Sequence, residues 1–205
     1  MLDKSVPFAT LFMHRPAGTP IPEFPLPEGF RFVMFQDGDE TDWARIETSV
    51  AEFDSEFEAL MSFKKEYIPE VKELYRRLLF IETTDGKKVA TANAWWSHVK
   101  CDRRAWIRSK KEKSTERRPF IHWVSVDPQY QGLGLGKAVT SRAMNILREI
   151  EGDVDMYLNT QTWSYKAIDI YRKCGFQPTD EAVLYDKKNK NDYAKAIKIL
   201  SELKR

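Results

Sequence analysis

Apolar residues recur at regular spacings along the chain, and these spacings predict many of its helices and strands. Residues 30–35 alternate between apolar and polar side chains, as in a strand with one buried face. Further on, apolar residues fall at helical spacing, at Trp43, Ile46, Val50 and Phe53. We therefore expect a first strand at 30–35, followed by a helix that carries these four residues on its buried side.

Capping and turn residues place the next elements. Ser55 and Glu58 form a capping box at the start of a second helix. Pro69 suits the first turn of another, short helix. The apolar runs 78–83 and 88–96 flank an Asp-Gly pair, a combination typical of a β-hairpin.

The second half of the chain alternates strand and helix patterns. The apolar run at 120–126 predicts a central strand, and a glycine-rich corner follows it. The later patterns predict a helix at 136–149, a strand at 154–160, a helix that starts at Ser164 and ends before Gly175, a strand at 182–185 and a helix at 192–203.

Two segments differ in composition from the rest. Residues 1–28 hold six of the ten prolines, which predicts an extended N-terminal arm, and its apolar residues suggest that the arm packs on the domain. Residues 100–118 hold nine Lys or Arg against three acids. Such a run is usually a solvated loop, and a nucleic-acid contact is unlikely because aromatic residues are not interleaved with the charges.

The glycine-rich corner carries the strongest chemical signal, with glycines at 132, 134 and 136. Glycine has no Cβ, so backbone N–H groups stay open to approach. They lie where a helix begins, and unpaired donors and the helix dipole there favour an anion such as phosphate. The glycines alone also suit a plain tight turn. A Rossmann motif or a P-loop fits less well, since the corner lies past the middle of the chain and Lys137 lacks the required Ser or Thr.

Two motifs resemble those of a known family. Val126-x-Pro128 followed by Gln131-x-x-Gly134-x-Gly136 resembles the acyl-CoA-binding signature of the GCN5-related N-acetyltransferase (GNAT) superfamily. A second block resembles the superfamily's Asn-x-x-Ala-x-x-x-Tyr pattern and the Gly-Phe that follows it. The matching residues are Ala167, Tyr171, Gly175 and Phe176, with Ser164 at the Asn position. The resemblance covers roughly residues 78–185.

This resemblance implies an α/β (α+β) fold. We expect one domain over 1–205, with a mixed, mostly antiparallel sheet of six to seven strands, splayed at the acyl-CoA site, and helices on both faces. The pantetheine arm of acetyl-CoA would enter between the splayed strands and pair with the backbone of 124–126 like an added strand.

The resemblance also implies which residues bind acetyl-CoA. The corner would hold the pyrophosphate mainly by main-chain donors, with the Gln131 amide and the Lys137 charge added. Ser164 would partly replace an Asn that contacts the pantetheine, and Asn159 offers an amide nearby. The full set is Val124, Ser125, Val126, Gln131, Gly132, Leu133, Gly134, Leu135, Gly136, Lys137, Asn159 and Ser164. No metal is expected.

Acetyl transfer to an amine needs a base for the ammonium and an acid for the leaving thiolate. Tyr171 occupies the position that resembles the superfamily's general acid, and otherwise it is a core aromatic residue. His122 stands where many relatives have a Glu, and along a strand it shares a face with Val124 and Val126. It is therefore a candidate base, with a satisfied core histidine as the alternative. Residues 160–162 are expected to face the thioester.

The amine acceptor is suggested by charge alone. Nine acids and one base lie between residues 37 and 58, in helices that wall the acceptor pocket in this superfamily. Such a wall would attract a cationic amine, with Glu47, Glu52 and Asp54 as the residues to test. For most of these acids, solvated helix faces are the better explanation.

The sequence thus favours an acetyl-CoA-dependent N-acetyltransferase that acts directly on a primary amine of a small molecule or peptide. A non-catalytic acyl-CoA-binding module is the alternative. Charge is nearly balanced, the two cysteines indicate neither a disulfide framework nor a zinc site, and no run of membrane length occurs. We expect a cytoplasmic protein that is a monomer or a homodimer.

Overall fold

The chain builds one mixed sheet flanked by helices. The computed structural model describes residues 2–98, 117–180 and 191–203. Its strands are β1 (Thr10–Arg15), β2 (Phe30–Met34), β3 (Leu78–Thr83), β4 (Lys88–His98), β5 (Arg117–Val126), β6 (Met156–Gln161) and β7 (Gln177–Thr179). Its helices are α1 (Glu40–Ser49), α2 (Glu56–Tyr67), α3 (Val71–Arg77), α5 (Leu135–Glu151), α6 (Tyr165–Lys173) and α7 (Tyr193–Glu202), with short 3₁₀ helices η1 (Ile68–Glu70), η2 (Pro128–Tyr130) and η3 (Thr162–Ser164).

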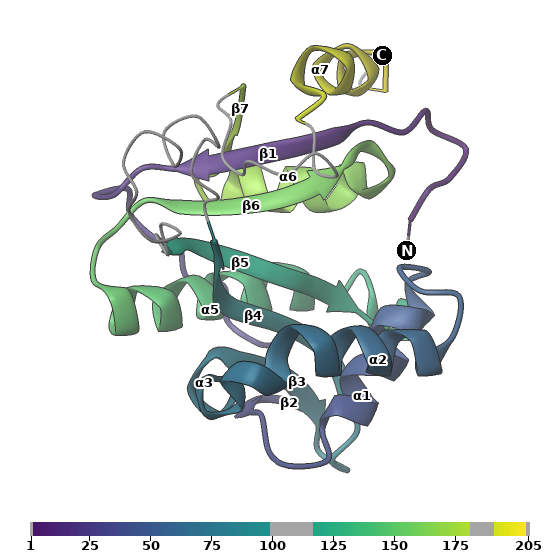
Figure 1. Ribbon diagram of the computed structural model, residues 1–205, viewed down its shortest axis with the longest axis vertical. Helices are drawn as coiled ribbons and strands as arrows, with labels where there is room; N and C mark the ends of the chain where they lie inside the picture. The colour runs from purple at the N-terminus through teal and green to yellow at the C-terminus, as the bar shows by residue number, and fades with distance from the viewer. Residues whose placement is uncertain (1, 99–116, 181–190, 204–205) are drawn as a thin grey trace, which may run out of the picture.

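The strand order is β2-β3-β4-β5-β6-β1-β7 within the described residues (Figure 1). Neighbouring strands are antiparallel except β5 and β6, which run parallel. The predicted hairpin is present as β3 and β4. The mixed, mostly antiparallel sheet of the expected fold is therefore confirmed.

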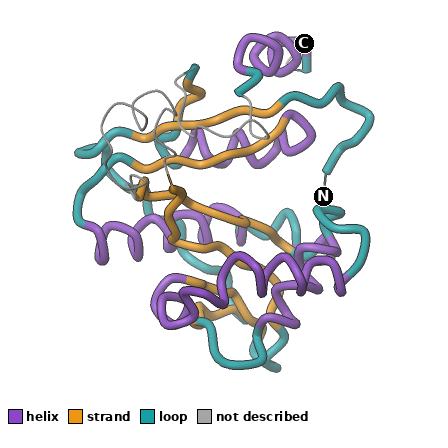
Figure 2. The backbone as a smooth tube through the Cα atoms, viewed as in Figure 1, coloured by secondary structure: helices purple, strands orange, loops and turns teal. Residues whose placement is uncertain are grey.

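The sheet opens between β5 and β6. Within the described strands the two are joined at one Cα pair, Phe120 opposite Tyr157. Beyond Phe120, β5 continues to Val126 on its own course, paired with β4 on its other side. Figure 2 shows the two strands diverging at this point. The splay that the resemblance implies is confirmed, and it leaves one edge of β5 free for a ligand.

Helices cover both faces because the strands alternate their apolar residues. In β3, Leu79 and Ile81 belong to the core that α5, α6 and α7 cover, whereas Leu78 and Phe80 belong to the core of α1, α2 and α3. Such alternation is the expected consequence of a strand's two-residue period. Figure 1 shows α1 and α2 on the near face and α5 and α6 on the far face. Two separate cores thus hold the sheet from its two sides.

The first helix ends earlier than the apolar spacing predicts. It stops at Ser49, and Ala51 adopts a positive φ of 69° that turns the chain out of the helix, so Phe53 lies outside it. The capping box predicted at the next helix is half formed. The Ser55 side chain accepts a hydrogen bond from the Glu58 N–H and begins α2.

The N-terminal region contributes a strand that the sequence analysis missed. In the described part of the predicted arm, residues 2–28, β1 lies inside the sheet, between β6 and β7. Phe12 is opposite Asn159 on one side and Thr179 on the other. The stretch between Pro7 and Pro16 is free of proline, so its N–H groups can pair on both sides. The strand expected to be first is therefore β2.

Two predicted segments lie wholly or mostly outside the described residues. The strand expected at 182–185 is one of them, and the last described strand of the sheet, β7, lies just before it at 177–179. Most of the basic run at 100–118 is the other, although its last two residues, Arg117 and Arg118, belong to β5. Among the described helices, none has the length and apolar character needed to cross a membrane.

Candidate active site

The glycine-rich corner joins β5 to α5 in a conformation that requires glycine. The Asp127 carboxylate accepts a hydrogen bond from the Gln129 N–H and fixes the turn that enters it. Gly132 and Gly134 both have a φ of +86°, where L side chains are strained. Gly134 is the N-cap of α5, and no described side chain caps that helix start. The corner therefore offers a helix N-terminus to an anion.

Gly136 has a different role from the other two glycines. A Cβ added there would meet Ile170 Cδ1 at 3.1 Å and Val126 Cγ2 at 3.7 Å. Gly136 thus lets the first turn of α5 lie close against α6 and the end of β5. This contact sets the position of the corner relative to the splayed strands.

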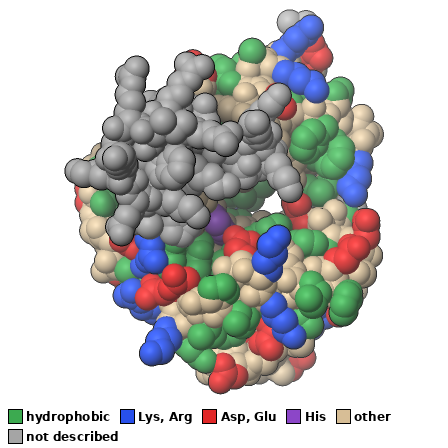
Figure 3. All heavy atoms as spheres, viewed as in Figure 1, with side chains coloured by type: hydrophobic (Ala, Val, Ile, Leu, Met, Phe, Trp, Pro, Cys, Tyr) green, Lys and Arg blue, Asp and Glu red, His purple; other side chains and the backbone are tan. Residues whose placement is uncertain are grey.

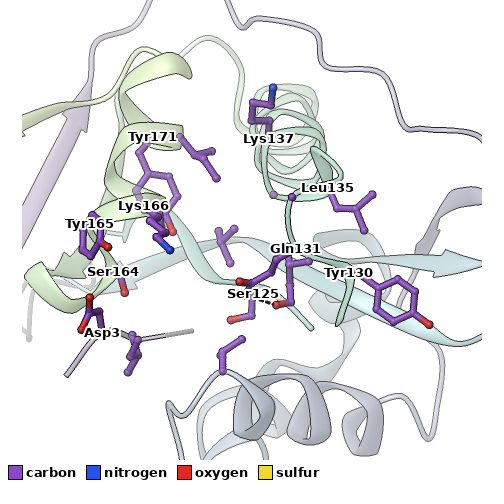
Figure 4. Close-up of a pocket in the computed structure, with 18 of the residues that line it drawn as sticks. Asp3, Ser125, Tyr130, Gln131, Leu135, Lys137, Ser164, Tyr165, Lys166 and Tyr171 are labelled. Carbon is purple, nitrogen blue, oxygen red and sulfur yellow. Dashed lines mark hydrogen bonds between the residues drawn. The ribbon is translucent and has the colours of Figure 1, made fainter. Parts of the chain in front are cut away.

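A first cavity of about 390 Å³ opens between the corner and α6. Figure 4 shows its walls, with Gln131, Leu135 and Lys137 on the corner side and Ser164 and Tyr171 on the opposite side. Eleven of the predicted acetyl-CoA and catalytic residues line it, namely Val124, Ser125, Val126, Gln131, Gly132, Gly134, Leu135, Gly136, Lys137, Ser164 and Tyr171. The structure therefore gathers most of the predicted set around one space.

Several predicted contacts are placed differently from the expectation. Leu133 is exposed and lines neither cavity formed by the described residues. Asn159 lines the second cavity instead of the first. The Gln131 side chain donates a 2.9 Å hydrogen bond to the Val126 carbonyl and so holds the end of β5. Ser164 is the N-cap of α6, but its side chain forms no capping hydrogen bond with the described chain.

A second cavity of about 430 Å³ lies between the splayed strands and the α1–α2 face. Figure 3 shows acidic side chains and a histidine around a hollow on this face. Glu47, Glu52 and Glu66 line the cavity, and no Lys or Arg does so among the described residues. Asp54 lines neither cavity in that part of the chain. The second cavity is therefore lined by acidic groups, while the first is lined by the glycine-rich corner and Lys137.

Tyr171 lies where the two cavities meet and lines both. Its side chain projects from α6 and is 7% exposed. Burial raises the pKa of the Tyr171 hydroxyl well above its ordinary value, and the carboxyl groups of Glu52 and Glu47 add to this effect. The hydroxyl thus keeps its proton near neutral pH and can donate a hydrogen bond.

Glu47 is a fully buried carboxyl group beside this junction. It projects from α1, and its Oε2 accepts a 2.8 Å hydrogen bond from the Ser125 hydroxyl. Its Oε1 has no hydrogen-bond partner among the described residues. Burial raises the pKa of Glu47 to about 8, with a smaller contribution from Glu52 and an opposing one from Ser125. The group thus changes its charge close to physiological pH.

Glu52 stands beside Glu47 because the chain turns back after α1. Its N–H donates to the Glu47 carbonyl at 3.2 Å, following the left-handed residue Ala51. The Glu52 carboxylate accepts a 3.1 Å hydrogen bond from Gln161 at the end of β6. Burial raises the pKa of Glu52, against the opposing effects of Gln161 and Lys4. Two carboxyl groups with raised pKa values therefore flank Tyr171.

His122 does not share a face with Val124 and Val126, so this expectation is wrong. A bulge interrupts the pairing of β4 with β5 between Thr91 and Asn93, and Trp123 has a φ of +48°. His122 and Trp123 consequently point to the same side, toward Glu66 of α2. Val124 and Val126 pack against the opposite core, beneath α5.

The bulge brings together three groups that the sequence does not connect. His122 Nδ1 lies 3.1 Å from Glu66 Oε1, and His122 Nε2 lies 3.2 Å from the Ser97 hydroxyl. All three side chains line the second cavity. Glu66 and Ser97 were missed because nothing local marks them, and only the folded sheet brings β4, β5 and α2 together.

The N-terminal segment forms part of the first cavity, which the sequence also did not indicate. Leu2 and Asp3 line it, and their N–H groups donate to the carbonyls of Val50 and Trp163. Of the residues expected to face the thioester, Thr160 and Gln161 line the second cavity. Thr162 instead hydrogen-bonds to the N-terminal segment at Pro7 and Ala9.

Structures of known proteins share this fold. A GCN5-related N-acetyltransferase from Sphaerobacter thermophilus matches with a TM-score of 0.61 at 20% identity, over 85% of this chain and 49% of that chain. A predicted acetyltransferase from Clostridium acetobutylicum, solved with acetyl-CoA, matches with a TM-score of 0.53 at 17% identity, over 77% of this chain and 96% of that chain. These identities are low, so the likeness concerns the fold.

Sequence comparison matches a shorter segment of the chain to one known protein, and a longer segment to a family model. The chain is 36% identical to a mycothiol acetyltransferase from Arthrobacter sp. (strain FB24) over a stretch of 69 residues. This stretch makes up 34% of this chain and only 21% of that protein. The family model for the acetyltransferase (GNAT) family matches residues 41–176. That match spans well over half of the chain and includes the glycine-rich corner, Tyr171 and every described residue that lines the first cavity except Leu2 and Asp3. The chain therefore belongs to the acetyltransferase (GNAT) family.

Proposed function

We propose that the chain is an acetyl-CoA-dependent N-acetyltransferase that moves the acetyl group directly to a primary amine of a small molecule or peptide. One observation carries the proposal. Tyr171 lies at the junction between a cavity with an anion site and a cavity lined by three glutamates. A donor with phosphates and an acceptor with an ammonium group would therefore meet at a proton donor.

The first cavity suits acetyl-CoA. Its corner presents a helix N-terminus to the pyrophosphate, and the Lys137 ammonium group at the rim lies 5.3 Å from the centre of the Phe24 ring. The free edge of β5 at 124–126 would pair with the amide groups of the pantetheine arm. The relative from Clostridium acetobutylicum, which has the same fold, was solved with acetyl-CoA.

The second cavity suits a cationic acceptor. Carboxylates that line a partly closed space attract an ammonium group and raise its local concentration. Tyr171 lines this cavity together with Glu47 and Glu52, and Glu52 also lines the first cavity. A primary amine that enters from this side would reach the thioester next to these two groups.

Glu47 is our proposed proton acceptor. An amine attacks only after its ammonium form has lost a proton, and the best base has a pKa close to the working pH. The pKa of Glu47 is about 8. The amine nitrogen would then bond to the thioester carbon, and the C–S bond would break. Tyr171 would protonate the thiolate and regain a proton from the nitrogen, which becomes the amide N–H, while Glu47 releases its proton to solvent. His122, which also lines the second cavity and lies 3.2 Å from the Ser97 hydroxyl, remains a second candidate base.

The proposal is tested by measuring acetyl-CoA binding by calorimetry and thiol release with a panel of amines. Binding with turnover on cationic amines supports it. Binding without turnover on any amine would contradict it and would identify a non-catalytic acyl-CoA-binding module. Absence of binding would show that the glycine-rich corner does not hold acetyl-CoA.

A further inference from the structure

The second cavity contains a serine, a histidine and a glutamate in series. Ser97 comes from β4, His122 from β5 and Glu66 from α2. The Ser97 hydroxyl lies 3.2 Å from His122 Nε2, and His122 Nδ1 lies 3.1 Å from Glu66 Oε1. Neither distance exceeds the range found between a nucleophile, its base and the group that orients the base.

Further contacts hold the imidazole in this orientation. The other Glu66 oxygen, Oε2, accepts a 3.2 Å hydrogen bond from the Trp123 indole N–H, so the carboxylate is fixed at both ends. The Phe120 ring meets the His122 ring edge to face, with centroids 5.5 Å apart. Because a carboxylate only accepts hydrogen bonds, the imidazole proton resides on Nδ1. The Nε2 lone pair then faces the serine hydroxyl.

We infer that Ser97 is a nucleophile, activated by His122 and positioned through Glu66, which attacks ester or thioester carbonyls that enter the second cavity. This activity goes beyond the transferase proposal, because it needs no amine. Tyr171 and Glu52 line both cavities and so lie at their junction, whereas Ser97, His122 and Glu66 line only the second cavity.

The reaction has two steps in which atoms and charge balance. The Ser97 oxygen bonds to the acyl carbon, its proton passes to His122 Nε2, and the leaving thiolate or alkoxide departs with that proton. Water then attacks the acyl carbon of the acyl-serine and gives a proton to His122. The bond from that carbon to the Ser97 oxygen breaks, the oxygen takes the proton back from His122, and the carboxylic acid leaves. The net reaction is hydrolysis, with the serine regenerated.

The first test is covalent labelling of the intact chain with a small alkyl fluorophosphonate. The Ser97 oxygen would bond to phosphorus and fluoride would leave. Intact mass and peptide mapping should show one adduct, on Ser97. Ser97→Ala should abolish it, while Ser201→Ala, which removes a hydroxyl on α7 outside both cavities, should label like the wild type. An adduct on Ser125 alone, or none, would overturn the proposal.

The second test concerns the positioning residue. Glu66→Gln keeps the shape of the side chain but removes the charge that orients His122. We expect the maximal labelling rate to fall about 100-fold, the usual effect of losing base assistance, with the half-saturating probe concentration unchanged. An unchanged maximal rate would overturn the proposal. Circular dichroism that shows a folded variant would separate the expected fall in rate from unfolding. Neither test depends on acetyl-CoA binding, so a failure here can be distinguished from a failure of the proposed function.

Discussion

The Ser125 hydroxyl donates a 2.8 Å hydrogen bond to the buried carboxyl of Glu47 and thereby links the free edge of β5 to helix α1. Ser125 lines the first cavity as well as the second, so this bond joins the proposed acetyl-CoA side to the acceptor side. The rest of the Glu47 side chain is surrounded by protein, which explains its raised pKa of about 8. A carboxyl group that titrates in this range can act both as a base and as a pH-sensitive element of stability.

We first predict that Glu47→Gln slows acetyl transfer. The rate of the wild type should rise with pH up to about 8, as Glu47 loses its proton and becomes able to accept one from the amine. The variant should lose this rise and show a kcat lower by about 100-fold or more. Steady-state kinetics across pH 6–9 with a saturating amine measure both effects. A retained rise in the variant would transfer the role of base to His122.

The same group predicts how stability changes with pH. The folded-state pKa of about 8 exceeds the ordinary value of 4.5, so between these pH values the folded chain holds more protons than the unfolded chain. The contribution of Glu47 is therefore fully present below pH 4.5 and is lost as the pH rises toward 8. In urea unfolding, the free energy of unfolding of Glu47→Gln should therefore rise relative to that of the wild type by up to about 1.4 kcal/mol for each pH unit between 4.5 and 8. If the free energies of unfolding of the two proteins changed with pH in the same way, the prediction would be wrong.

The sequence was sufficient where a local rule determines the structure. Ser55 begins α2 as its spacing from Glu58 indicates, and the turn before residue 88 produces the β3–β4 hairpin. The glycine-rich corner needs glycine at 132 and 134 because of their positive φ angles. These features depend on residues within a few positions of one another, so the sequence alone reveals them.

The sequence was insufficient where distant segments decide the structure. β1 pairs with β6 about 140 residues later, and no local pattern announces this partner. The bulge at Trp123 places a bulky residue at positive φ, which its type disfavours, so simple alternation put His122 on the wrong face. The contacts of His122 with Ser97 and Glu66 depend on that bulge and on the packing of α2.

Tyr171→Phe should separate binding from chemistry. The change removes only the hydroxyl, and the ring stays against Phe176 in the same core. We expect the acetyl-CoA dissociation constant to stay within about twofold, while kcat falls by about 100-fold as the thiolate loses its proton donor. Calorimetry and thiol-release kinetics on the same preparation test this. A kcat close to that of the wild type would exclude Tyr171 as the acid.

Substitutions at Gly134 should show that backbone conformation governs the corner. A Cβ there meets nothing within 4 Å, so the strain comes from the φ of +86°. Gly134→Val should destabilise the fold by at least about 1–2 kcal/mol and abolish acetyl-CoA binding, because a β-branched residue disfavours this conformation. Gly134→Asn is the matched control, since Asn tolerates positive φ, and it should retain more affinity. If both variants lost acetyl-CoA affinity to the same extent, the added side chain would be obstructing the ligand, and the backbone conformation would not be the cause.

The acidic cavity predicts selectivity for cationic acceptors, and two neighbouring acids provide a matched comparison. Glu52 lines both cavities, whereas Asp54, two residues further on, lines neither within the described residues. Glu52→Gln should raise the KM of a cationic amine by about tenfold at low salt, because one charge pair in a partly buried site is worth 1.4 kcal/mol or more. Asp54→Asn should leave the KM of the same amine unchanged.

Salt provides a second check. Added salt should shrink the difference in KM between the wild type and Glu52→Gln, since salt screens the attraction that the wild type retains. Equal KM values for the two variants would show that the acids near α1 do not select the acceptor.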